Sequence, residues 1–184
     1  MSSTRGPKTP PGSPFFKSAF KGSRVAIVSS RYHPAISQGL LQGATDTLQM
    51  AGLSLKKVVT LEVPGAFEIP AAVARVLAGD AVDGIITLGC VIRGQTKHHY
   101  YISMAVTQAL MNLTTRSRIP IVFGVLTPDT LAQARARSLG QPKHNKGREA
   151  AWALLEMMAL YGKLKKVFPM SKARGRSGLW PMYA

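Results

Sequence analysis

The chain is poor in cysteine, because Cys90 is the only one among its 184 residues. A single cysteine excludes an internal disulfide framework and a metal site built from several cysteines. No stretch of about 18 apolar residues occurs either, so we predict no membrane-spanning helix. The N-terminus has no apolar segment followed by a small-residue cleavage site, so we do not expect secretion. The expected location is cytoplasmic, or plastid if the source is a plant or alga.

Acidic residues are also scarce. Eight Asp and Glu stand against 24 Lys and Arg, which gives a formal net charge of +16 at pH 7. Most of this excess lies at the two ends, because residues 1–24 and 163–184 contain several Lys and Arg and no acid. Basic ends can bind nucleic acid or another anionic surface. They can equally be solvated tails that keep an assembly in solution, so a polyanion contact is one of two interpretations.

Length and composition indicate one folded domain between two irregular arms. A chain of this length suits one ordinary domain, and 46% hydrophobic residues is typical of a globular protein. Proline and glycine are frequent in residues 1–22 and again near the C-terminus, where they oppose both helix and sheet. We therefore predict a flexible basic arm over 1–22, an α/β domain over 23–163 and a basic tail over 164–184.

Between the arms, short apolar segments rich in β-branched residues alternate with segments of helical periodicity. The expected strands are 25–29, 57–63, 84–89 and 119–127, and the expected helices are 34–51, 67–78, 97–117, 129–139 and 146–162. Buried strands that alternate with helices predict an α/β fold, in which a four-stranded parallel sheet carries helices on both faces. Ligands of such folds bind beyond the carboxyl ends of the strands.

The segment GCVIRGQTKH, residues 89–98, follows the third expected strand. Backbone N–H groups and the helix dipole at the start of the next helix favour an anion there. Gly94 would allow close approach of a phosphate and Thr96 would add a hydroxyl donor, although Thr96 is also a good helix cap. His98 is a plausible proton shuttle beside an anion or simply an exposed residue. His99 lies about 100° further around the helix, so we expect only one of the two histidines to face the site.

Other strand ends carry further candidates. Glu68 at the start of a helix either gains from the dipole or accepts hydrogen bonds from a polyol or amine. Tyr32 either stacks on a planar heterocycle or packs against a neighbour. Arg137 and Lys146 either hold a phosphate or are solvated. Cys90 is either a nucleophile or, as we expect, a buried thiol, because no base partner is evident.

Taken together and in this order, the motifs resemble those of the lumazine synthase family, which makes 6,7-dimethyl-8-ribityllumazine in riboflavin biosynthesis. The resemblance covers about residues 24–162. The segments that carry it are LLQGA (40–44), VPGAFEIP (63–70), LGCVIRGQTKHH (88–99), PIVFGVLTPDT (120–130), HNKGREAA (144–151) and LLEMMAL (154–160).

The resemblance implies a flavodoxin-like three-layer sandwich and a transferase without metal or redox cofactor. The family condenses 5-amino-6-(D-ribitylamino)uracil with 3,4-dihydroxy-2-butanone 4-phosphate, and releases phosphate and water. His98 then takes the acid/base role. Residues implied to bind the pyrimidine and ribityl groups are Tyr32, Ala66, Phe67, Glu68, Val91, Ile92, Phe123 and Lys146, and those implied to bind phosphate are Gln95, Thr96 and Arg137.

The same resemblance implies an oligomer, since Phe123, Arg137 and Lys146 match residues that a neighbouring subunit contributes. The segment between Arg137 and Lys146 is one residue longer than in shell-forming members, and the proline-rich arm is poorly suited to pairing as an edge strand. We therefore expect a homopentamer or decamer rather than a 60-subunit shell. Tyr100 stands where the family commonly has an acid near the catalytic histidine, so any help from that acid is missing here.

Two other classes of function compete with a lumazine synthase. A non-catalytic assembly that binds a flavin or a lumazine would keep the fold and the ligand slot, but the chain also retains Glu68, Thr96, His98, Arg137 and Lys146. A nucleic-acid-associated particle would depend on the basic ends, and neither end carries a recognised nucleic-acid-binding motif.

Overall fold

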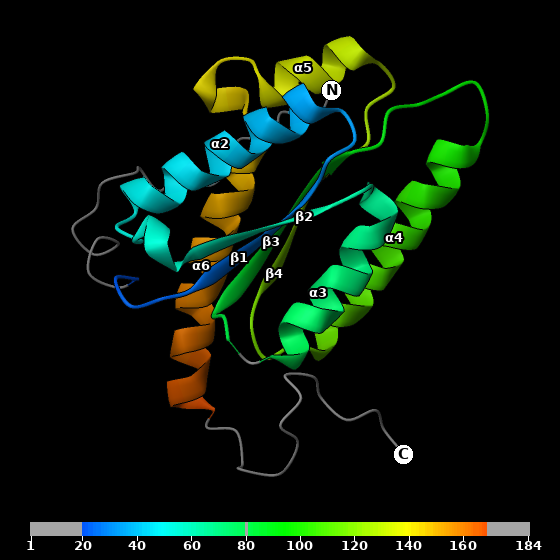
Figure 1. Cartoon of the computed structure of the whole chain (residues 1–184). Helices are drawn as coiled ribbons and strands as arrows, with labels where there is room; N and C mark the ends of the chain where they lie inside the picture. The colour runs from blue at the N-terminus through cyan, green and yellow to red at the C-terminus, as the bar shows by residue number, and fades with distance from the viewer. Residues whose placement is uncertain (1–19, 80, 169–184) are drawn as a thin grey trace, which may run out of the picture.

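The computed structural model describes residues 20–79 and 81–168 (Figure 1). The strands are β1 (Val25–Ser30), β2 (Val58–Val63), β3 (Gly84–Cys90) and β4 (Ile121–Leu126). The helices are α2 (Pro34–Met50), α3 (Ile69–Ala78), α4 (His98–Arg116), α5 (Leu131–Ser138) and α6 (Lys146–Val167). Single 3-10 turns lie at η1 (Leu55–Lys57), η2 (Ala66–Glu68) and η3 (Pro142–His144).

The four strands form one parallel sheet in the order β2-β1-β3-β4, which confirms the predicted α/β fold. Helices α2, α5 and α6 cover one face of this sheet, and α3 and α4 cover the other (Figure 1). The central strands β1 and β3 are buried along their whole length, as expected where helices cover both faces. Because all four strands run the same way, their carboxyl ends meet at one edge of the sheet, where the site is expected.

Alternation along β1 shows how the core is divided. Val25 and Ile27 pack in the cluster formed with α2 and α6, while Ala26 and Val28 pack in the cluster formed with α3 and α4. Side chains of a strand point alternately to its two faces, so a continuous apolar run supplies both clusters. Phe20, placed in the flexible arm by the sequence, is 4% exposed and belongs to the first cluster.

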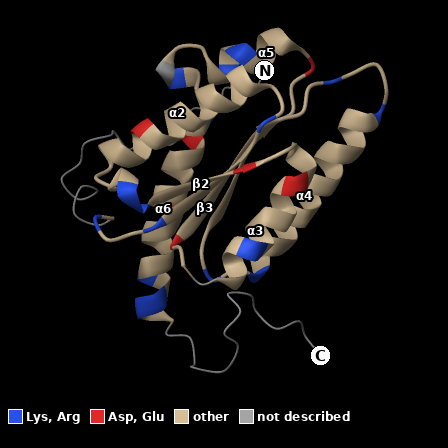
Figure 2. Ribbon diagram, in the orientation of Figure 1, with Lys and Arg blue, Asp and Glu red and all other residues tan. Residues whose placement is uncertain are grey.

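Two element boundaries differ from the expectation. Helix α5 begins at Leu131, because the Thr130 side chain caps it by accepting a hydrogen bond from the Gln133 N–H at 3.2 Å, so Pro128 and Asp129 precede the helix. Helix α6 continues past the expected end at Gly162 to Val167. A glycine inside a helix costs only about 1 kcal/mol relative to alanine, and the lysines of the last turns of α6 lie in solvent (Figure 2). The expected arm over 1–19 and the tail beyond 168 lie outside the described residues.

Candidate active site

The carboxyl ends of β1, β2 and β3 open into a hollow of about 840 Å³, which we call the histidine hollow. This volume lies within the range of roughly 300–1,000 Å³ that small-molecule sites occupy. The hollow is lined from the β1–α2 junction, the η2 turn, the loop after β3 and the first two turns of α4. Of the predicted site residues, it brings together Tyr32, Ala66, Phe67, Glu68, Val91, Ile92, Thr96 and His98.

The loop after β3 is fastened to the loop after β4. The Val91 N–H donates to the Leu126 carbonyl at 2.8 Å, and the Arg93 N–H donates to the Pro128 carbonyl at 3.0 Å. The Val91 N–H is therefore already engaged, whereas the Ile92 N–H between these two anchors donates to no described residue. Of the two backbone contacts expected here, Ile92 is the one whose donor is available to a ligand.

Further along this loop, the protein itself does not require a glycine at position 94. A Cβ built on Gly94 meets no atom within 4 Å, and the Gly94 φ is not positive. Thr96 is exposed, and its hydroxyl accepts only a long hydrogen bond of 3.4 Å from the His98 N–H. Gln95 is exposed and lines neither this hollow nor the one described below. The open space beside Gly94 and Thr96 can therefore accept an anion.

Three of the chain's four histidines line the histidine hollow: His33, His98 and His99. The expectation that only one of His98 and His99 faces the site was wrong, because both line the hollow. The hollow borders an arc of the first two turns of α4 that is wider than the roughly 100° between neighbouring residues of a helix. His33 was not among the predicted residues. It has a φ of 56°, the only positive value of a non-glycine residue in the described part of the chain, and such conformations often occur at functional sites.

Tyr32 and Glu68 line the hollow and make few contacts with the rest of the protein. Tyr32 is 67% exposed and meets the His33 ring edge-on, with ring centroids 5.0 Å apart. One carboxylate oxygen of Glu68 accepts the Gly65 N–H at 2.8 Å, and its other oxygen accepts from no described residue. An exposed aromatic ring and a carboxylate with a free oxygen suit a planar heterocycle that carries hydroxyl groups.

Cys90 lines the hollow from the end of β3 but is 3% exposed and forms no disulfide. Burial raises the pKa of its thiol from 9.0 to about 11. Because the thiolate is the nucleophilic form, Cys90 is nearly inert at neutral pH. The expectation of a buried thiol is confirmed.

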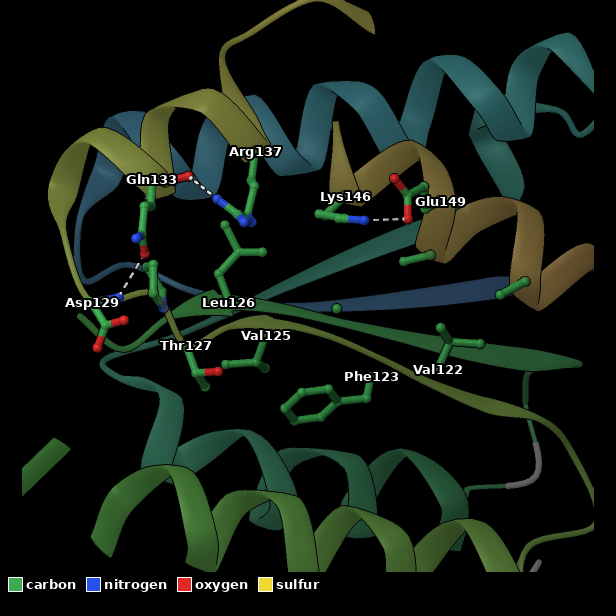
Figure 3. A pocket seen from close by; sticks show the side chains of 14 residues that line it. Val122, Phe123, Val125, Leu126, Thr127, Asp129, Gln133, Arg137, Lys146 and Glu149 are labelled. Atoms are coloured by element: carbon green, nitrogen blue, oxygen red, sulfur yellow. Dashed lines mark hydrogen bonds and ion pairs between the residues drawn. The ribbon is translucent and has the colours of Figure 1, made fainter. Parts of the chain in front are cut away.

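A second hollow of about 520 Å³, the arginine hollow, lies along the edge strand β4 between α5 and α6 (Figure 3). It brings together three further predicted residues, Phe123, Arg137 and Lys146. Lys146 Nζ forms an ion pair with Glu149 Oε2 at 2.7 Å, and Arg137 donates to the Gln133 carbonyl at 3.2 Å. Phe123 is 43% exposed and points to the other side of β4, toward α3 and α4 (Figure 3).

Asn145 holds the frame of the arginine hollow, and sequence reasoning missed it. Its amide nitrogen donates to the Gly39 carbonyl at 2.9 Å and the Ser138 carbonyl at 2.6 Å. Its side-chain oxygen caps α6 by accepting from the N–H groups of Gly147 and Arg148. Because the side chain is buried and joins the end of α5 to the start of α6, it fixes the positions of the two cations. The HNKG motif was the available signal, but one partner of Asn145, the Gly39 carbonyl, lies 106 residues away in the sequence.

The two hollows have no lining residue in common. Apart from Gln95, which lines neither hollow, the predicted residues thus fall into the two groups that the sequence resemblance assigned to neighbouring subunits. Within residues 20–79 and 81–168, no group of three or more His, Cys, Asp and Glu is placed to hold a metal ion, and none of the helices has the length and apolar character to cross a membrane.

Comparison with known proteins identifies the family of this chain. The model of the family described as 6,7-dimethyl-8-ribityllumazine synthase matches residues 22–162. The chain belongs to the 6,7-dimethyl-8-ribityllumazine synthase family. The matched range includes every residue that lines either hollow.

Individual relatives agree with the family match. A 6,7-dimethyl-8-ribityllumazine synthase of Leuconostoc mesenteroides is 39% identical over 144 residues, which cover 78% of this chain and 92% of the relative. The synthase of Salinibacter ruber is 41% identical over the same shares of the two chains. That of Campylobacter concisus is 41% identical over 147 residues, or 79% of this chain and 94% of the relative. The similarity therefore spans nearly the whole length of each lumazine synthase.

Proposed function

We propose that the chain is an active lumazine synthase whose catalytic site is assembled from the histidine hollow of one subunit and the arginine hollow of the next. It condenses 5-amino-6-(D-ribitylamino)uracil with 3,4-dihydroxy-2-butanone 4-phosphate and releases phosphate and water. The observation that carries the proposal is the division of chemistry between the hollows. Imine formation and loss of phosphate need both proton transfer and stabilisation of an anion. The histidine hollow has the proton-transfer groups and space for an anion beside Gly94, but no Lys or Arg is among its lining residues, whereas the arginine hollow has Arg137 and Lys146 and no histidine.

In this proposal, the histidine hollow binds the pyrimidine. Tyr32 stacks on the ring, Glu68 accepts from the ribityl hydroxyls near Ala66 and Phe67, and the backbone of Val91 and Ile92 contacts the uracil. Gln95 and Thr96 meet the phosphate, and His98 transfers protons. The neighbour adds Phe123 and Lys146 to the pyrimidine side and Arg137 to the phosphate. Much of the rate then comes from holding two substrates in a reactive orientation.

Exposed apolar faces support assembly into a homo-oligomer. Helix α4 presents a run of large exposed side chains over most of its length: Tyr100, Tyr101, Met104 and Met111, each more than 40% exposed. A contiguous apolar face of this kind is unusual on a monomer and is typical of interfaces. We propose a pentamer or a decamer rather than a 60-subunit shell, in the cytoplasm. Native mass separates the three assemblies.

The catalytic part of the proposal is tested by incubating the purified protein with both substrates and recording lumazine fluorescence. The wild-type protein should form product, and a lack of product would refute the synthase in favour of a non-catalytic ligand-binding assembly.

The divided site is tested by co-assembling His98→Ala subunits with Arg137→Ala subunits in equal amounts. Roughly a quarter of the sites then combine two intact halves, so activity rises well above that of either variant alone.

The matched control co-assembles His98→Ala with Glu68→Gln, which damage the same hollow. Every mixed site then contains one damaged histidine hollow, so no recovery is expected. Equal recovery in both mixtures, or in neither, would contradict a site shared between subunits.

We also propose 23–163 as the catalytic domain and 1–22 and 164–184 as its basic flanks. Because Phe20 packs in the core and α6 reaches Val167, the deletion that tests the flanks should remove 1–19 and 169–184 only. We expect this truncated chain to keep lumazine synthase activity and to lose any salt-dependent retention of nucleic acid. Retention that survives the deletion would exclude the flanks as its cause.

A further inference from the structure

His99 makes a hydrogen bond that determines the state of its ring. Its Nδ1 lies 2.9 Å from the carbonyl oxygen of Thr96, at the start of α4. A carbonyl oxygen only accepts, so the proton of this bond must be on Nδ1. The neutral ring then has its lone pair on Nε2. A hydrogen bond at one ring nitrogen, here to the Thr96 carbonyl, sets the tautomer and orients the other nitrogen for proton transfer. His98 has no such bond from its ring to any described residue.

The reaction needs more than one proton transfer. Imine formation joins the substrate amine to the ketone and needs an acid that protonates the departing hydroxyl, which leaves as water. Phosphate loss needs a base that removes the proton from the carbon beside the imine. The electron pair of that C–H bond becomes a C=C bond, while the pair of the C–O bond leaves with the phosphate. The terminal carbon, which has lost the phosphate, later gains a proton and becomes a methyl group of the product.

We propose that His99 is a further catalytic residue, an inference that rests on the proposed synthase function. Its Nε2 takes the proton from the carbon beside the imine as phosphate leaves, while His98 serves the departing hydroxyl. The His99 imidazolium then delivers the proton to the terminal carbon. The enol hydroxyl loses its own proton to water as the ketone forms, and the departing phosphate takes up one proton. His99 ends neutral and ready for the next turnover.

Position 100 has no acid that could assist His98, so a second proton-transfer group must come from elsewhere, and the His99 imidazole is the candidate. Tyr100 occupies that position, lies 53% exposed and lines neither hollow, and its ring meets that of Tyr101 edge-on. His99 is half-buried and lines the hollow beside His98. In the proposal, the proton transfers that an acid near His98 would assist are divided between His98 and His99.

Other titratable groups line the same hollow and would contribute to any measured pH dependence of the activity. They come from the β1–α2 junction, η2, β3 and α4: Tyr32, His33, Glu68, Cys90, His98 and Tyr101. Because several ionisable groups line the same hollow, a pH profile alone does not identify His99. The decisive measurement must report the step in which the carbon-bound proton moves.

The experiment compares His99→Asn with His99→Phe and with His144→Asn. Asparagine places an amide N–H where Nδ1–H stands, so it keeps the hydrogen bond to the Thr96 carbonyl but cannot act as a base. Phenylalanine keeps a ring and loses both functions. His144 is exposed, lines neither hollow and provides the matched control. Each protein is assayed with the butanone phosphate and with the same compound deuterated at the carbon that loses its proton.

For His99→Asn we expect kcat to fall about 10²-fold with little change in KM, and the deuterium isotope effect on kcat to increase because proton removal becomes rate-limiting. His144→Asn should match the wild type. Wild-type kcat in His99→Asn, with a slow His99→Phe, would show that only the hydrogen bond matters and would overturn the proposal. So would a slow His99→Asn whose isotope effect is unchanged. A wild-type protein without product refutes the synthase function instead, and is recognised before any variant is compared.

Discussion

The two hollows differ both in their charged groups and in how their walls are held. The histidine hollow is lined by three histidines and one carboxylate, and no Lys or Arg is among its lining residues. The arginine hollow is lined by Arg137 and Lys146 with Asp129 and Glu149, and contains no histidine. One surface can move protons and the other carries permanent cations. Because the proposed reaction needs both functions and the two hollows share no lining residue, we propose a site made by two copies.

The two hollows also differ in how firmly their walls are held, because the arginine hollow is cross-linked by hydrogen bonds and the loop of the histidine hollow is exposed. The cations of the arginine hollow stand on helices joined by the buried Asn145. In the histidine hollow, residues 93–98 are exposed, and open space surrounds Gly94. Fixed charges gain from a rigid frame because their geometry is set before the substrate binds. The exposed loop can adjust to the phosphate. The following substitutions test this contrast, from the largest expected effect to the smallest.

His98→Ala should have the largest effect on turnover. It removes an acid/base group, which typically contributes about 10²–10⁴-fold to a rate, while Tyr32 and Glu68 still bind the pyrimidine. Stopped-flow lumazine fluorescence gives kcat, and equilibrium titration with the pyrimidine substrate gives its affinity. A collapse of pyrimidine binding would mean that His98 is structural, and would weaken the assignment of proton transfer to this hollow.

Asn145→Ala should mainly lower stability. It removes the cap of α6 and the hydrogen bonds to the Ser138 and Gly39 carbonyls, of which the first is buried, so we expect the loss of about 2–4 kcal/mol. Thermal unfolding at fixed protein concentration measures this loss, because dilution would change the assembly as well. Thr96→Ala, in the exposed loop of the other hollow, is the control and should change stability by less than about 0.5 kcal/mol. Similar losses in the two variants would contradict the contrast in rigidity.

Gly94→Ala should leave folding intact and affect the phosphate substrate. The new methyl group meets no protein atom within 4 Å, so any effect on activity comes from the ligand's space. We expect KM for the butanone phosphate to rise by about 10-fold, on the order of 1.4 kcal/mol, with unchanged thermal stability. An unchanged KM would remove Gly94 from the phosphate site.

The smallest expected effect is at Cys90, whose thiol should react very slowly with an alkylating reagent. Because its pKa is raised from 9.0 to about 11, the thiolate fraction at pH 7–9 is roughly 10²-fold below that of an ordinary thiol. Alkylation by iodoacetamide should be slow in the native protein over this range, and should become fast after denaturation. Rapid labelling of the folded enzyme would show that the end of β3 opens to solvent.

Much of the fold followed from the sequence because the two kinds of periodicity are distinct. Runs such as 25–29 and 84–89 are almost wholly apolar, with Ser29 and Thr87 as their polar members, and this is typical of strands covered on both faces. The helical segments between them bury one stripe. Ends of elements were less predictable. Gly162 was expected to end α6, but its cost is small beside the stabilisation that a long helix gains from packing.

The site could be predicted as two groups of residues, but not the roles of all its members. Tyr32, Glu68, Thr96 and His98 were found because they stand at strand ends within motifs. His99 was excluded by helical geometry, which holds along a helix but not where a hollow covers its first turn. Asn145 was missed because its side chain bonds the carbonyls of Gly39 and Ser138, the first of them 106 residues away, and such contacts are seen only in the folded chain.

The separation of the two hollows also bears on how the enzyme responds to its own abundance. With the site divided between subunits as proposed, an isolated subunit has no complete catalytic centre. Specific activity then falls on dilution, and at low expression the output of lumazine rises more steeply than the number of chains made. A cell could in this way keep the enzyme silent until enough copies have accumulated, without any dedicated inhibitor.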